Sequence, residues 1–153
     1  MCCRACVASL SIVISVLLSV VLDAGAGGGQ IEPDTGPGGR RWMPMPLFPP
    51  GAAVIVLVGN PLRGSAYMYV KFPVAYAPPL HSHTATERIY VSRGTLLLKR
   101  PNAETVREPA GQYFVVEART VHTTVCAGPE DCFCYVSIDR AFDVIPFRHD
   151  NRF

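Results

Sequence analysis

Two histidines and a glutamate in the middle of the chain form a set of side chains that can bind a metal ion. Only one residue separates His81 from His83, so on an extended backbone both imidazoles point to the same side. Glu87 follows after a short run of Thr and Ala that can redirect the chain. Neutral imidazoles and a carboxylate suit divalent iron, manganese, zinc, nickel or copper. Half of the chain's four histidines fall in this one tripeptide, which favours a shared role.

The competing interpretation is a solvated strand edge, with both rings in water and Glu87 as an ordinary surface acid. A third histidine favours the metal site instead. His122 lies in a second segment, from Gly111 to Cys126, that is rich in β-branched and aromatic residues. Three imidazoles and one carboxylate would complete a ligand set for a transition metal.

These two segments resemble the two sequence motifs of the cupin superfamily. The first motif, His-x-His-x(3)-Glu-x(6)-Gly, matches at every fixed position from His81 to Gly94. The second, Gly-x(5)-Pro-x-Gly-x(2)-His-x(3)-Asn, is met by Gly111 and His122. The resemblance extends over residues 42–147 and implies an all-β, double-stranded β-helix barrel of the jelly-roll kind. It also implies one divalent transition metal, bound by His81, His83, Glu87 and His122.

Three positions of the second motif are occupied differently here. Glu117 stands in place of the proline, Arg119 in place of the glycine and Cys126 in place of the asparagine. The proline and glycine shape the turn that delivers the last histidine, so these departures bear on the turn geometry. A left-handed backbone at Arg119 would cost on the order of 1 kcal/mol, because the residue carries a side chain. The ligand positions themselves all carry ligating residues.

The amino-terminal residues are typical of an export signal. Arg4 supplies a positive charge, and residues 7–22 are apolar or small and uncharged. We expect a signal peptide over 1–26, with cleavage near Ala26, and a protein that is secreted or periplasmic. An uncleaved membrane anchor is the alternative, although this stretch is shorter than the about twenty residues that a span needs.

The rest of the chain divides by composition. Residues 27–41 are rich in Gly and Pro, which predicts a flexible linker. Residues 42–148 are expected to form the barrel, and 149–153 a tail. A net charge of +2, from 14 basic and 12 acidic side chains without a basic run, gives no support for nucleic-acid binding.

Three cysteines remain beyond the expected signal, and export would place them in an oxidising compartment. Cys126 and Cys132 flank a turn-rich connection of five residues, so we predict a disulfide between them that leaves Cys134 free. A bond from Cys126 to Cys134 and three free thiols are the alternatives.

About eight or nine short strands separated by turn signals favour a closed barrel or sandwich. The expected strands are 53–59, 65–72, 74–77, 88–92, 95–99, 113–116, 121–126 and 133–138, with 142–147 as a further short strand. Strand alternation places Ile89 and Val91 on the face of Glu87, and Thr124 on that of His122, with Tyr90 on the outside. The pocket wall should therefore be mostly apolar. The apolar segment from Trp42 to Pro50 is expected to lie as a strap against the barrel.

A metal with open coordination positions can act as a Lewis acid or activate oxygen. We expect a small metal-dependent enzyme of the dioxygenase type that acts on a small organic molecule in the barrel. A binding or sensing module without catalysis is the alternative, and a purely structural barrel is a third interpretation. The sequence assigns no catalytic residue besides the ligands, does not identify the metal or the substrate, and leaves a homodimer open.

Overall fold

The computed structural model describes residues 35–148, which belong to one compact unit. The expected signal segment, most of the expected linker and the expected tail (149–153) lie outside the described residues. Residues 35–41, the end of the expected linker, form a 3-10 turn, η1 (Pro37–Gly39), and a bridge between Thr35 and Arg41. Arg40 also donates two hydrogen bonds from Nη1 to the carbonyls of Val56 and Leu57.

The described chain is all β, with short strands and no α-helix between residues 35 and 148. The strands are β1 (Met43–Pro44), β2 (Ala53–Gly59), β3 (Ala66–Phe72), β4 (His81–Ser82), β5 (Glu87–Arg93), β6 (Thr95–Lys99), β7 (Val106–Pro109), β8 (Tyr113–Val116), β9 (Thr123–Cys126), β10 (Cys132–Ile138) and β11 (Ile145–Pro146). All pairings between them are antiparallel. No helix of the described residues is long and apolar enough to cross a membrane.

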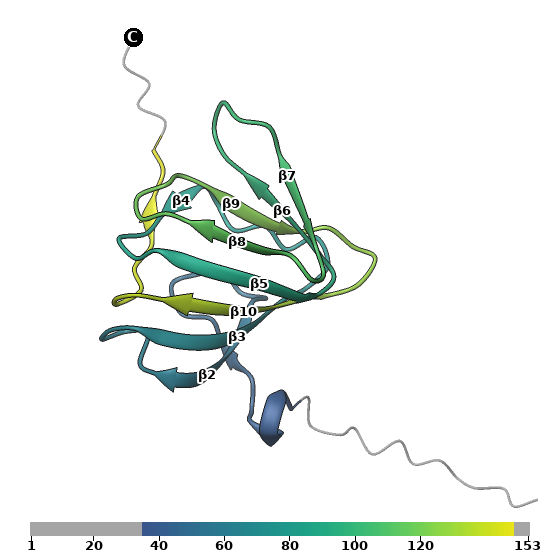
Figure 1. Cartoon of the computed structure of the whole chain (residues 1–153), viewed down its shortest axis with the longest axis vertical. Coiled ribbons are helices and arrows are strands. Elements are labelled where there is room, and N and C mark those ends of the chain that lie inside the picture. The colour runs from purple at the N-terminus through teal and green to yellow at the C-terminus, as the bar shows by residue number, and fades with distance from the viewer. Residues whose placement is uncertain (1–34, 149–153) are drawn as a thin grey trace, which may run out of the picture. The chain divides into compact units, whose positions relative to one another are not determined.

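The strands form three sheets, with the orders β1-β2-β3-β10-β5-β8, β7-β6-β9 and β11-β4. In Figure 1, β8, β5, β10, β3 and β2 follow one another across the large sheet, with the hairpin of β6 and β7 beside it. Strand β10 therefore inserts between β3 and β5, although it comes much later in the sequence. This antiparallel barrel agrees with the double-stranded β-helix expected from the sequence.

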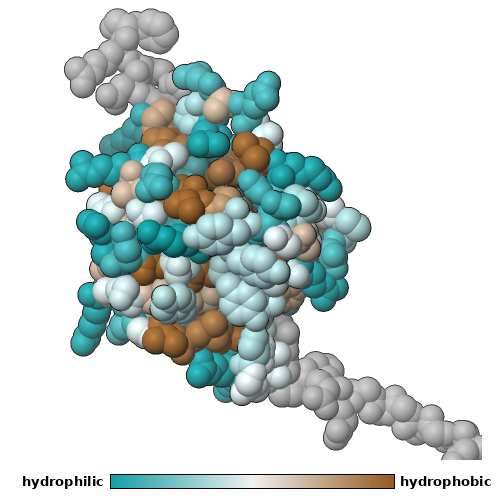
Figure 2. All heavy atoms as spheres, in the orientation of Figure 1, coloured by the Kyte–Doolittle hydropathy of each residue, from teal (hydrophilic) through white to brown (hydrophobic). Residues whose placement is uncertain are grey.

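Alternation of side chains accounts for the core. In β10, and in β5 from Glu87 to Val91, every second residue is buried, as a strand with one face on the core requires. Inward side chains of the large sheet, such as Val70 and Val91, pack in one cluster with Leu96 and Leu98 of β6. The outward side chains of β5, β8 and β10 include Tyr90, as predicted. Apolar side chains also reach the surface in patches between hydrophilic ones (Figure 2).

The prediction of a strand over 74–77 is wrong. This segment is a turn in which Ala75 has a positive φ of 63°. Prolines on both sides of it, Pro73 and Pro78, disfavour regular pairing. Two short strands, β1 and β7, were not predicted, whereas β4 corresponds to the extended His-x-His segment. Strand β7 has one aliphatic residue in Val106-Arg-Glu-Pro109 and pairs only with β6, at the edge of its sheet.

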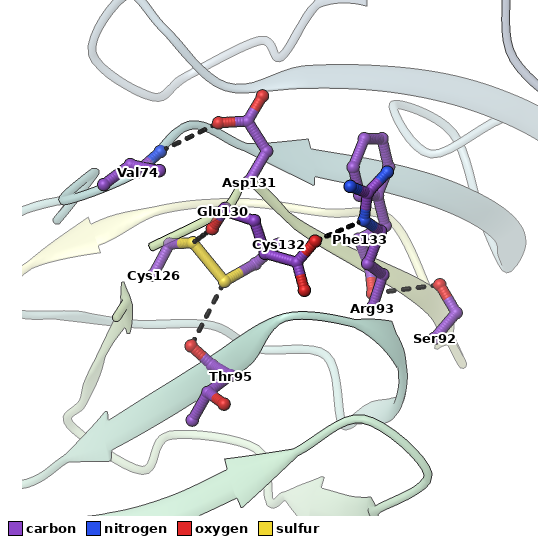
Figure 3. Close-up of a disulfide and its surroundings, with 9 residues drawn as sticks. All are labelled: Val74, Ser92, Arg93, Thr95, Cys126, Glu130, Asp131, Cys132 and Phe133. Atoms are coloured by element: carbon purple, nitrogen blue, oxygen red, sulfur yellow. Dashed lines mark hydrogen bonds and ion pairs between the residues drawn. A yellow bond between two sulfur atoms is a disulfide. The ribbon is translucent and has the colours of Figure 1, made fainter. Parts of the chain in front are cut away.

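The structure joins Cys126 to Cys132 in a disulfide and leaves Cys134 as a buried free thiol, as the sequence predicted. Cys126 ends β9 and Cys132 begins β10, so the bond connects the three-stranded sheet to the six-stranded one (Figure 3). The enclosed loop is held on both sides. Asp131 Oδ1 accepts a hydrogen bond from the Val74 N–H at 3.0 Å, and Glu130 pairs with Arg93 at 2.7 Å.

Candidate metal site

The backbone brings the two histidine segments together directly. His81, in β4, and His122, just before β9, form an antiparallel bridge. The His81 N–H donates to the His122 carbonyl at 3.0 Å, and the His122 N–H donates to the His81 carbonyl at 2.8 Å. This pairing fixes the relative position of the two imidazoles. His83 follows β4, and Glu87 begins β5.

The four predicted ligands converge in the barrel interior. Ring nitrogens of His81, His83 and His122, one from each, all lie within 4.8 Å of one another. These side chains are buried, with exposed fractions of 3%, 2% and 2%, and Glu87 is only 7% exposed. The Glu87 Oε2 atom lies 3.6 Å from His83 Nε2 and 3.5 Å from His122 Nε2. The structure thus gathers the residues that the motifs proposed.

Backbone carbonyls orient all three rings in the same sense. His81 Nδ1 lies 2.6 Å from the Pro79 carbonyl, His122 Nδ1 lies 3.0 Å from the Thr120 carbonyl, and His83 Nδ1 contacts the Asp143 carbonyl. A carbonyl oxygen can only accept, so each Nδ1 must carry the hydrogen and donate it. In the neutral ring this leaves Nε2 with a free lone pair, which is the form in which an imidazole binds a metal.

The electrostatics favour a neutral His81 ring and an ionised Glu87. Burial lowers the pKa of His81 to about 4, against the opposing effect of its hydrogen bond to Pro79, so this ring is neutral near pH 7. Burial alone would raise the pKa of Glu87, but the adjacent His122, His83 and His81 rings lower it overall. The Nε2 atom of His83 is buried without a hydrogen-bond partner in the described structure. A buried ring nitrogen without a hydrogen-bond partner, next to a carboxylate, fits a site for a bound cation.

Arg119, where the motif has glycine, does adopt a left-handed backbone, with φ of 65°. Its N–H donates to the His83 carbonyl at 2.6 Å, and the Thr120 N–H closes the turn on the Glu117 carbonyl at 3.1 Å. The turn geometry is therefore kept at the expected cost of about 1 kcal/mol. The Glu117 side chain is exposed and takes no part in the site.

The wall around the four ligands is mostly apolar, as predicted. The cavity beside them has a volume of about 30 Å³. Its lining includes Met45, Phe48, Ile89, Leu96, Thr124 and Cys134. Burial raises the pKa of the Cys134 thiol, which stays protonated. Among the described residues that line the cavity, Glu87 is the one carboxylate.

The sequence did not identify three residues that complete this site. Phe48 lies with its ring centroid 5.1 Å from that of His81, and Phe142 lies 4.5 Å from that of His83. Asp143 holds the His83 ring through its carbonyl and also accepts the Thr84 N–H on Oδ1 at 2.8 Å. The apolar strap and the expected last strand indicated their segments, but no local pattern indicated these contacts.

A comparison with family models finds a match between residues 37–140 and the ChrR Cupin-like domain. None of the curated proteins compared with this chain matches it.

Solved structures with the same fold are similar at low identity. KdgF from Halomonas sp. is 20% identical, with a TM-score of 0.54 over 74% of this chain and 94% of that one. An oxalate oxidase is 22% identical, with a TM-score of 0.52 over 64% of this chain and 56% of that one. The Cnp3 cupin domain of Schizosaccharomyces pombe is 17% identical, with a TM-score of 0.52 over 58% and 61% of the two chains. Together these likenesses show the cupin fold.

Proposed function

Because the chain belongs to the family of ChrR cupin-like domains, we propose that it binds one divalent transition metal through His81, His83, Glu87 and His122. The observation that carries this proposal is the common orientation of the three imidazoles. Each donates its Nδ1 hydrogen to a backbone carbonyl and so presents an Nε2 lone pair to the same small space. Glu87 adds a negative charge at that point.

The donor set limits the choice of metal and of chemistry. Three imidazole nitrogens and one carboxylate oxygen suit divalent iron, manganese, nickel, copper or zinc, and they disfavour calcium and magnesium, which prefer oxygen ligands. Such an ion supplies Lewis acidity or oxygen activation when it is bound. The protein's own residues hold the donors in place, keep the His81 imidazole neutral and surround the site with an apolar wall.

On this basis the protein is a small metal-dependent enzyme of the dioxygenase type that acts on a small organic molecule. The buried apolar surroundings support oxygen chemistry, because they protect reactive species from water. The oxalate oxidase among the similar structures shares the fold at 22% identity, which leaves the substrate of this chain open.

The second candidate is a metal-dependent binding or sensing module without catalysis. One observation favours it. Apart from the four ligands, the described lining of the cavity offers the hydroxyl of Thr124 and the thiol of Cys134, and that thiol's pKa is raised by burial. Neither group is a general acid or base near neutral pH.

The test begins with the metal. Full-length protein expressed in medium supplied with each candidate metal should carry close to one ion per chain by elemental analysis. His83→Ala should lose most of it, whereas His149→Ala, which changes the one histidine outside both motifs, should keep it. Equal metal content in both variants would refute the site. Oxygen uptake by the loaded protein with a panel of enediols and catechols then separates enzyme from binder.

Export is also part of this proposal. It is supported by the charged and apolar character of residues 1–26 and by the disulfide, which persists in oxidising compartments. The division into a signal (1–26), a linker (27–41), a barrel (42–148) and a tail (149–153) is proposed on the same grounds. Mass spectrometry of the protein recovered from its native compartment would show whether the chain begins near Gly27.

A further inference from the structure

The metal cavity and a larger hollow beside it share a wall that contains one aromatic side chain outside the proposed ligands, that of Phe48. The metal cavity of about 30 Å³ has room for an ion and a water or two. The hollow beside it has a volume of about 380 Å³, within the range of small-molecule sites. Phe48, Pro78 and His81 line both spaces. The imidazole of one proposed ligand therefore borders the hollow directly.

The hollow has an apolar lining. Its other walls come from the strap, from the segment before β4 and from the carboxyl-terminal segment; they include Leu47, Pro79, Leu80, Val144 and Pro146. No Asp, Glu, Lys or Arg of the described residues lines it. A molecule with several hydroxyl or carboxylate groups would lose hydration there without gaining partners. The lining favours a molecule with an aliphatic or aromatic body.

Phe48 belongs to a segment that makes few backbone hydrogen bonds. Pro46, Pro49 and Pro50 flank Phe48 and have no N–H to donate. Beyond β1, which pairs with β2, the strap is anchored by the Met45 N–H, which donates to the Ala52 carbonyl at 3.0 Å, and by the Tyr76 hydroxyl, which donates to the Pro49 carbonyl at 2.8 Å. Phe48 is partly exposed and stacks on Phe142, with ring centroids 5.8 Å apart. Of the three residues that line both spaces, Pro78 has a ring fixed to the backbone and His81 is held through Nδ1, so Phe48 is the one whose side chain is free to rotate aside.

We propose that the hollow is the binding site for the apolar body of the ligand, and that Phe48 is the gate between it and the metal. The ligand class is a small carboxylate, or an equivalent oxygen donor, on an aliphatic or aromatic body. The oxygen head reaches the metal beside His81, and the body replaces water in the hollow. This inference rests on the proposed metal site and adds a substrate class to it.

The test uses full-length protein loaded with cobalt(II), whose visible spectrum reports ligand binding without any turnover. Titrations compare acetate, hexanoate, phenylacetate and gluconate. Each methylene buried in the hollow should tighten binding by up to roughly fourfold, so hexanoate should bind at least ~10-fold more tightly than acetate. Phenylacetate should follow hexanoate, and gluconate should bind no better than acetate. Equal affinities for acetate and hexanoate, or a preference for gluconate, would overturn the proposal.

Two variants examine the hollow and the gate separately. Val144→Phe fills the hollow and should remove the preference for hexanoate while leaving acetate binding and cobalt content unchanged. Phe48→Ala should speed hexanoate association in stopped-flow measurements by ~10-fold or more. Leu47→Ala, a neighbour in the strap, is the matched control and should lower hexanoate affinity without that acceleration. A Phe48→Ala rate equal to that of the parent would refute the gate.

Cobalt content separates this inference from the one on which it rests. If the parent protein binds no cobalt, the proposed metal site is wrong. If it binds one ion per chain and still shows no preference for an apolar body, the metal site stands and the hollow is not the ligand site. Should Val144→Phe lose cobalt through misfolding, Leu47→Ala and the parent titrations still decide the question.

Discussion

The disulfide between Cys126 and Cys132 offers the most direct quantitative test of the structure. The bond closes a loop with a sequence separation of 6. The chain-entropy relation for a loop of this size predicts that it stabilises the fold by about 2 kcal/mol. Both cysteines are fully buried, and the bond joins two sheets. We therefore expect that its removal creates no new stabilising contact that would offset this loss.

The measurement is urea unfolding of the same full-length protein with the disulfide intact and after reduction. With a urea m-value of ~2 kcal/mol/M, a loss of about 2 kcal/mol lowers the midpoint by about 1 M. Comparing two redox states of one sequence avoids the cavity cost that cysteine replacement adds. The double variant Cys126→Ala with Cys132→Ala is the control, because a reductant should leave its midpoint unchanged.

Metal content gives a second readout in the same experiment. His122 is held by its backbone pairing with His81, at the end of β9 opposite to the disulfide. Reduction should therefore lower stability without releasing the ion. Midpoints that agree within a few tenths of 1 M would show that the bond does not constrain the unfolded chain. Free thiols at Cys126 and Cys132 in protein taken from its native compartment would remove the support for export.

Three further outcomes follow from the site. Glu87→Gln should weaken metal binding by at least ~10-fold, measured by competition with a chelator, whereas Glu117→Gln should change it little; the reverse order would place the acidic ligand at Glu117. Arg119→Gly should stabilise the protein towards urea by up to about 1 kcal/mol, because it relieves a left-handed backbone, while Arg119→Ala should give no such gain. Asp143→Ala removes the hydrogen bond that the Thr84 N–H donates to Asp143 Oδ1, and it should lower metal affinity by roughly 10-fold, with one ion still bound at saturation. Unchanged affinity would mean that the His83 ring needs no support from that segment.

Local pattern was enough to predict most of the barrel. Strands β2, β6 and β8 have the predicted bounds, because each is a compact apolar or β-branched run between clear turn signals. The same rule failed at 74–77, where an apolar run lies between prolines and turns instead of pairing. It missed β7, since an edge strand with one solvent face needs little apolar character. Composition therefore predicts central strands better than edges and turns.

The candidate ligands followed from the spacing of two motifs, but the architecture around them did not. Local contacts orient two of the three imidazoles. His81 and His122 each donate a hydrogen bond to the carbonyl two residues earlier in the chain. Such a contact arises wherever the backbone adopts that turn, so it comes with the motif. His83 is different, because its Nδ1 partner is the carbonyl of Asp143, 60 residues away in sequence. No local pattern can specify that contact.

The carboxyl-terminal segment therefore does more than close the barrel. Two hydrogen bonds hold it on either side of His81 and His83. The Phe147 N–H donates to the Leu80 carbonyl at 3.0 Å, and the Thr84 N–H donates to Asp143 Oδ1. Asp139 Oδ1 accepts the Thr86 N–H at 3.1 Å, immediately before Glu87. The same segment supplies Val144 to the wall of the hollow. Because this stretch of chain orients a ligand ring through Asp143 and lines the hollow through Val144, a change at Asp143 should alter metal affinity and a change at Val144 should alter ligand preference, whereas a change at Glu117 should alter neither.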